Sequence, residues 1–209
     1  MPNIKTYGLI CFSIIIFLCI TNNISATENN NVLAEAGEKL KFESVIKKAK
    51  ESIVIISSNR YKDPDVDPSQ SSLCSGVVVN EIGHILTNFH CIYNQKYIKV
   101  VYYDKTDWQT YDVEVIGTDP LADLALLKVI GKEEKIPYLK FAPDIKNLAA
   151  GTEVFALGHP MGMIWTVTKG IISSNSRFMK HPYIKALQTD AAINKGNSGG
   201  PLMNMRGEI

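Results

Sequence analysis

Short runs of β-branched and aromatic residues, separated by turn-forming residues, dominate the chain from residue 53 to its end. No long helical pattern interrupts these runs, and each has the length and composition of a β-strand. We predict strands over residues 53–56, 76–79, 85–87, 97–103, 111–118, 124–129, 152–157, 167–174, 184–189 and 201–203. Regularly spaced short strands with Gly, Asn and Asp turns predict an all-β protein, built as an antiparallel sandwich or as closed barrels.

The remaining patterns divide the chain into segments. Residues 27–41 are polar with little periodicity and are expected to form a flexible lead-in. Apolar residues then fall at helical spacing and predict a short amphipathic helix over 42–51. A charged connector over 131–150 separates two strand-rich stretches. Two lobes are therefore predicted, near 42–130 and 151–209.

The first 26 residues have the regions of a secretory signal peptide. Lys5 precedes an apolar run over 9–20, and the small residues Ser25 and Ala26 follow it. As a helix this run would span about 18 Å, whereas a bilayer has a hydrocarbon core of about 30 Å. We expect cleavage after residue 26 and an exported, periplasmic or extracellular protein. Membrane association is expected only if the signal stays uncleaved.

Composition narrows the function classes. The chain is 45% hydrophobic and 21% charged, which is ordinary for a globular protein. Loss of Lys5 with the signal would leave 21 basic residues against 21 acidic ones. A neutral chain without a Lys/Arg cluster has no electrostatic basis for binding nucleic acid. Two cysteines, Cys74 and Cys91, remain after the signal, and an exported pair invites a disulfide.

Three segments carry residues suited to acyl transfer, which needs a nucleophile, a base, a group that orients the base, and donors for the oxyanion. Ser198 lies in a glycine-rich turn, where the backbone N–H groups of Gly196 and Ser198 can point at one developing charge. His90 directly follows a predicted strand, and Asp123 directly precedes another. Catalytic groups commonly lie on such loops of a rigid scaffold.

The order of these motifs resembles the trypsin-like double-β-barrel proteases. Thr87–Cys91, Asp123–Lys128 and Gly196–Pro201 carry that resemblance. Two further stretches, Phe155–Gly162 and Leu187–Ser198, resemble the high-temperature-requirement (HtrA/Deg) family within that clan.

The similarity runs from about Phe42 to Ile209 and implies two six-stranded antiparallel β-barrels. Because the sequence stops 11 residues after Ser198, the second barrel is expected to be incomplete and the chain to be truncated.

The resemblance implies a serine endopeptidase that uses neither a cofactor nor a metal. Ser198 would attack the peptide bond, His90 would accept and return the proton, and Asp123 would hold the imidazole. Gly196, Asn197 and Ser198 would form the oxyanion hole. The substrates would be polypeptides, such as misfolded exported proteins, and the family resemblance suggests a trimer-based homo-oligomer.

The resemblance also implies a specificity pocket and a disulfide. Ala192 would occupy the position where trypsin has a pocket aspartate, and Ile193 would narrow the pocket. We expect cleavage after small aliphatic residues, since a buried cation would find no counter-charge. Ile193 as an ordinary core residue is the alternative. Cys74 and Cys91 would form the bond that brackets the histidine loop.

Other interpretations stay open at this point. A protease-like fold can bind peptides or act as a chaperone without cutting them, and a truncated fragment can be inactive. A purely structural β-protein would leave the three ordered motifs unexplained. His84, His159 and His181 lack a second ligand at metal-binding spacing, so we expect them to be turn or surface residues.

Overall fold

The computed structural model describes residues 34–63, 65, 71–131, 135–145, 148–160, 163–178 and 185–209. The chain separates into two compact units, Met1–Ser44 and Val45–Ile209. The predicted signal peptide, the polar residues up to 33 and His181 lie outside the described residues. In the described part of the chain, no helix combines the length and the hydrophobicity needed to cross a membrane.

The helix before the first strand is longer than predicted. Residues 34–50 are helical, whereas a flexible lead-in was expected up to 41 and a helix only over 42–51. The part expected to be flexible contains Ala34, Glu35, Ala36, Glu38, Lys39 and Leu40. These are strong helix formers, so intrinsic propensity forms a helix there without an apolar face.

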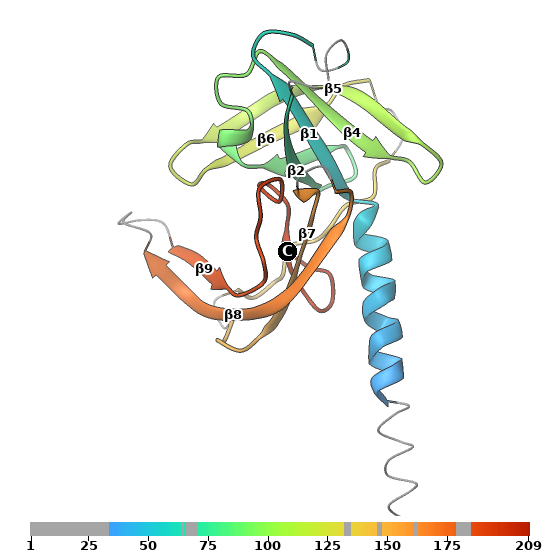
Figure 1. Ribbon diagram of the computed structural model, residues 1–209, viewed down its shortest axis with the longest axis vertical. Helices are drawn as coiled ribbons and strands as arrows, with labels where there is room; N and C mark the ends of the chain where they lie inside the picture. The colour runs from blue at the N-terminus through green and yellow to red at the C-terminus, as the bar shows by residue number, and fades with distance from the viewer. Residues whose placement is uncertain are drawn as a thin grey trace, which may run out of the picture. The chain divides into compact units, whose positions relative to one another are not determined.

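Six antiparallel strands close into a barrel, as predicted for the first lobe (Figure 1). Their order around the barrel is β1-β2-β3-β6-β5-β4, and pairing of β1 with β4 closes it. The strands are β1 (Ile53–Asn59), β2 (Ser72–Val78), β3 (His84–Thr87), β4 (Tyr97–Tyr103), β5 (Trp108–Asp119) and β6 (Leu124–Val129).

The barrel is filled by alternating side chains. In β6, Ala125, Leu127 and Val129 are buried while the residues between them are not. Successive side chains of a strand point to opposite faces, so every second residue enters the core. Ile85 and Val100 are fully buried from neighbouring strands. Burying an aliphatic side chain of this size stabilises a fold by roughly 1.5–3 kcal/mol.

The connector expected over 131–150 has no strand or helix in its described parts, but it does more than join two lobes. Ile136 and Leu139 are buried, and Ile136 belongs to the barrel core. Their N–H groups donate to the carbonyls of Glu81 and Val78. Two apolar residues among charged ones therefore fasten this segment to the barrel.

The second lobe is an open four-stranded antiparallel sheet with the order β10-β7-β8-β9. The strands are β7 (Glu153–Gly158), β8 (Thr166–Phe178), β9 (Lys185–Thr189) and β10 (Leu202–Asn204). Phe155, Leu157, Ile172 and Met203 are its largest fully buried side chains. The protein is thus all-β with one closed six-stranded barrel, and the described residues of the second lobe form an open sheet where a second barrel was expected.

The segment between β9 and β10 brings the two lobes together. It leaves the second sheet, runs back to the barrel and returns, as the red loop in Figure 1 shows. At its turn, the Ser75 N–H on β2 donates to the Ser198 carbonyl at 2.8 Å. The nucleophile candidate therefore lies against the barrel that carries the other two site residues.

Candidate active site

His90 projects from a short 3-10 helix, η2 (Phe89–Cys91), that follows β3 almost directly. The buried Ser58 hydroxyl donates to the Cys91 carbonyl at 2.8 Å. A disulfide joins Cys91 to Cys74 on β2. The helix is thus tied to two strands of the barrel, while 56% of the His90 side chain is exposed to solvent.

Asp123 holds His90 from the loop before β6. Its Oδ2 lies 2.7 Å from His90 Nδ1, and its Oδ1 accepts the His90 backbone N–H at 2.8 Å. The Asp123 carbonyl also accepts the Phe89 N–H at 3.1 Å. Both the ring and the backbone of the histidine segment are therefore oriented by one aspartate.

This contact decides which ring nitrogen of His90 is free. Since a carboxylate only accepts hydrogen bonds, Nδ1 must carry the proton that lies between the two groups. In the neutral ring, Nε2 is then the unprotonated nitrogen and the one able to take a proton. That tautomer is the one a general base of this type requires.

The turn that carries Ser198 is bound to the buried Ser75 of β2. The Ser75 hydroxyl donates to the Gly196 carbonyl at 2.8 Å and accepts the His159 N–H at 2.9 Å. The Ser75 N–H donates to the Ser198 carbonyl. Ser75 is completely buried, so these bonds form away from water and fix both sides of the turn.

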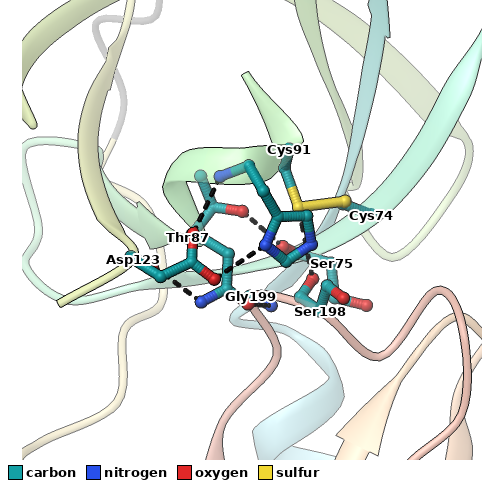
Figure 2. Close-up of polar contacts among 9 residues, drawn as sticks. Cys74, Ser75, Thr87, Cys91, Asp123, Ser198 and Gly199 are labelled. Carbon is teal, nitrogen blue, oxygen red and sulfur yellow. Dashed lines mark hydrogen bonds and ion pairs between the residues drawn. A yellow bond between two sulfur atoms is a disulfide. The ribbon is translucent and has the colours of Figure 1, made fainter. Parts of the chain in front are cut away.

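Gly199 lets this turn approach the barrel closely. Its φ of 81° lies in the left-handed region that favours glycine. A Cβ at this position would fall 2.2 Å from the Ser75 carbonyl oxygen and 2.3 Å from Thr87 Oγ1. A side chain of any size would therefore displace the turn from Ser75 and Thr87, which Figure 2 shows near Gly199 and Ser198.

Two N–H groups of the turn are available to an oxyanion. Among the described residues, neither the Gly196 nor the Ser198 backbone N–H has a hydrogen-bond acceptor. The Asn197 N–H instead donates to the Asn194 carbonyl at 3.0 Å. Two unoccupied donors flanking an occupied one suit a site for a developing negative charge.

His90 and Ser198 line the same pocket, together with Cys74, Lys195 and Gly196. No hydrogen bond joins the Ser198 hydroxyl to the His90 ring within the described structure. Catalytic hydrogen bonds are often long in unliganded sites and tighten when substrate binds. The structure thus brings all three predicted catalytic residues to one place, with the His90–Asp123 contact already formed.

The same pocket contains one group of side chains with metal-ligand character in the part of the chain described. Suitable atoms of Cys74, His90 and Cys91 lie within 4.8 Å of one another. Both sulfur atoms are joined in the disulfide, so neither is a thiolate, the form that coordinates metal. In this oxidised state, only the imidazole of the group could serve as a ligand.

Comparison with known proteins agrees with this geometry. A family model described as the trypsin-like peptidase domain matches residues 74–209, which include His90, Asp123 and Ser198. The chain belongs to the trypsin-like peptidase family.

Within the trypsin-like peptidases, the similarity is to the HtrA/Deg type. A probable periplasmic serine endoprotease, DegP-like, from Pseudomonas putida (strain GB-1) is 43% identical over 139 residues, 66% of this chain. The match covers 28% of that protein, so the chain spans less than a third of this relative's length.

Two solved structures share the fold. The HtrA-type protease AlgW with tripeptide has a TM-score of 0.68 at 30% identity, covering 80% of this chain and 52% of that one. Deg5 has a TM-score of 0.69 at 29% identity, covering 82% of both chains.

The predicted specificity residues of this trypsin-like peptidase lie on the same segment, before the turn. The Ala192 carbonyl accepts a hydrogen bond from Thr168 Oγ1 at 2.9 Å. Ile193 is 57% exposed, so it is not a core residue within this chain. Neither residue lines the pocket that His90 and Ser198 share.

Sequence reasoning missed two residues that shape the site, Ser75 and Asn88. Ser75 lies just before the strand predicted over 76–79, and no local signal marked it, because its buried partners come from distant segments. Asn88 donates from Nδ2 to the Asp123 carbonyl at 2.8 Å and accepts the Gly199 N–H at 2.6 Å. The only signal in the sequence was the position of Asn88, two residues before His90.

One expectation about histidines was wrong. His159 is 1% exposed, not a turn or surface residue. It packs edge-on against Trp108 of β5 and accepts the backbone N–H of Trp165 on Nδ1 at 3.3 Å. Burial lowers its pKa from 6.5 to about 4, which keeps the ring neutral. A Gly-His-Pro sequence suggests a turn, but this turn lies between the lobes.

Proposed function

We propose that the chain carries the catalytic centre of an HtrA-type serine endopeptidase. Ser198 Oγ attacks the substrate carbonyl carbon while its proton passes to His90 Nε2. The same proton then moves from His90 to the leaving amine. In the second half-reaction, His90 takes a proton from water, the water oxygen attacks the acyl carbon, and His90 returns the proton to Ser198 Oγ as the acid leaves. Asp123 stabilises the imidazolium that forms in each half of the reaction.

The observation that carries this proposal is the His90–Asp123 contact of 2.7 Å beside a pocket that Ser198 also lines. The N–H groups of Gly196 and Ser198 would stabilise the tetrahedral oxyanion, and Asn197 would hold the turn in shape through Asn194. Removing one such donor from a serine protease typically costs a factor of about 10²–10³ in kcat.

The finer assignments belong to the same proposal. Ala192 and Ile193 would restrict the substrate residue before the cut to small aliphatic side chains, because they present no charge to a cation. An exposed Ile193 supports this role, since it can contact a substrate rather than the core. A peptide library that is cleaved preferentially after Lys or Arg would exclude it.

The cellular setting is proposed from the relatives. The related proteins are named as periplasmic, and the predicted signal peptide over 1–26 is consistent with export of this chain. Misfolded or exported polypeptides would be the substrates. We further propose a trimer-based assembly on family resemblance, which sedimentation of the intact protein measures directly.

Labelling with an active-site-directed fluorophosphonate tests the central proposal. We expect wild-type protein to be labelled and Ser198→Ala to remain unlabelled. Because the chain spans 28% of a curated relative, a version extended past Ile209 is labelled in parallel. Labelling that persists in Ser198→Ala would remove Ser198 from its role.

The same experiment separates the alternative, a peptide-binding module that does not cut. A protein that binds unfolded polypeptides but stays unlabelled in both lengths would support that function. Labelling of the longer version alone would support an inactive short form of an active protease.

A further inference from the structure

We propose that Asn88 is a positioning residue that sets the Ser198 turn in register with the His90–Asp123 pair. Asn88 belongs to the histidine segment, and its amide group contacts the other two catalytic segments. Asn88 itself lies two residues before His90, its Nδ2 binds the Asp123 carbonyl, and its Oδ1 binds the Gly199 N–H next to Ser198. The kinetic test of this inference rests on the proposed function, whereas its structural test does not.

Asn88 occupies a helix-capping position, but its side chain does not cap the helix. Asn88 occupies the N-cap position of η2, with φ of −77° and ψ of 146°. An asparagine there normally accepts an N–H from the first turn of the helix. The Asn88 side chain makes no such capping bond. Both ends of its amide are used instead between loops that are distant in sequence.

One of the two contacts, that with Gly199, also crosses the boundary between the lobes. Asp123 and Asn88 lie on the barrel, whereas Gly199 follows the second sheet. The lobes meet at the turn, where a Gly199 Cβ would come within 3.0 Å of the Asn88 backbone nitrogen. At so close an approach, the short hydrogen bond between Asn88 Oδ1 and the Gly199 N–H helps to set the distance between the turn and the imidazole.

Asn88 complements the anchor that Ser75 supplies. Ser75 binds the Gly196 and Ser198 carbonyls and thus holds the turn toward β2. Asn88 binds the N–H on the other side of Ser198, at Gly199. With both anchors, the residues before and after the nucleophile are fixed, and among the described residues only the Asn88 side chain bonds both the turn and the Asp123 segment.

Two substitutions distinguish the hydrogen bond to the Asp123 carbonyl from the hydrogen bond to the Gly199 N–H. Asn88→Ala removes both hydrogen bonds. Asn88→Asp keeps an acceptor for the Gly199 N–H but places an oxygen opposite the Asp123 carbonyl, where no donor remains. Asn80→Ala is the matched control, because Asn80 is also half-buried and its amide contacts His84, outside the site.

Amide hydrogen exchange at Gly199, measured by NMR, tests the geometry without any need for activity. We expect exchange at Gly199 to be at least about tenfold faster in Asn88→Ala, to stay near the wild-type rate in Asn88→Asp, and to be unchanged in Asn80→Ala. Unchanged exchange in Asn88→Ala would overturn the proposal. If Asn88→Ala does not fold, loss of Gly199 protection in Asn88→Asp would overturn it instead.

Peptide cleavage and fluorophosphonate labelling then test the consequence. We expect kcat to fall about 10- to 100-fold in Asn88→Ala and by less in Asn88→Asp, with KM changed less than about threefold. A loss of rate no larger than that of Asn80→Ala would show a merely structural role and overturn the proposal. If wild type is neither labelled nor active, the proposed function fails, and the Gly199 exchange alone decides whether Asn88 holds the turn.

Discussion

Asp123 has a left-handed backbone conformation, with φ of 54°. Asp and Asn tolerate this region better than other residues with a side chain. The conformation places the Asp123 carbonyl and carboxylate toward the same segment, where they accept hydrogen bonds from Asn88, Phe89 and His90. Local strain here is thus offset by four contacts that orient the proposed base.

Asp123→Asn should lower the rate without lowering stability much. Asn keeps the left-handed tolerance, but its amide cannot hold His90 in the same tautomer, so we expect kcat to fall about 10⁴-fold. Steady-state cleavage of a peptide substrate measures the change. A fall of less than tenfold in a folded variant would mean that Asp123 does not act as the third catalytic residue.

Ser75→Ala should lower both stability and rate. The variant leaves the buried Gly196 carbonyl and the His159 N–H without their partner, at a cost of about 1–3 kcal/mol for each unsatisfied group. Urea unfolding measures this loss. Ser57→Ala is a suitable control, since Ser57 is also a buried serine of the barrel, and a loss no larger than in the control would contradict the role of Ser75.

At the scale of elements, each predicted strand corresponds to an observed strand. Observed and predicted boundaries differ where pairing with a neighbouring strand continues beyond the predicted end. β2 begins at Ser72, four residues before the strand predicted over 76–79. Ser72 and Leu73 pair with Ser58 and Ser57 of β1, so register across the barrel decides where pairing begins.

The disulfide acts at this scale, because it fastens η2 to β2. The two cysteines are 17 positions apart in the sequence, and closing a loop of that size corresponds to about 3 kcal/mol on the chain-entropy model. We expect reduction to lower the free energy of unfolding by about this amount and to slow labelling of Ser198. Urea titrations with and without reductant measure the first effect.

A Cys74→Ala/Cys91→Ala variant provides the control for that experiment. It should match the reduced wild type in stability and show no further response to reductant. Equal stability of oxidised and reduced wild type would mean that the barrel alone holds the histidine helix.

At the scale of the whole second unit, an aromatic cluster joins the lobes. Tyr103 and Trp108 of the barrel contact Trp165, whose ring lies 5.3 Å from Trp108. His159 packs into this cluster, and its backbone N–H donates to the buried Ser75 hydroxyl. The same hydroxyl donates to Gly196 in the Ser198 turn. Packing at the lobe interface and placement of the nucleophile therefore depend on one another.

This cluster should make stability depend on pH. The folded protein keeps His159 neutral, since burial lowers its pKa from 6.5 to about 4. Between these pH values the unfolded chain binds more protons, so the stability is fully present above about pH 6.5 and falls as pH falls toward 4. The full shift corresponds to a loss on the order of 3 kcal/mol.

His159→Gln removes the titration but keeps a polar side chain. Carboxylates titrate in both proteins, so we compare the difference in unfolding free energy between wild type and variant across pH 4 to 6.5. We expect wild type to lose more stability than the variant as pH falls. Parallel curves would show that His159 does not carry the effect.

The sequence by itself determined the strand pattern, the all-β class and the identity of His90, Asp123 and Ser198 as catalytic candidates. Alternation and turn residues are local, and the three motifs are short and ordered, so neither needs knowledge of the fold. Only the tertiary structure decided the roles of Ser75, Asn88 and His159. Their partners lie on distant segments, and hydrogen bonds or burial between such segments leave no local pattern in the chain.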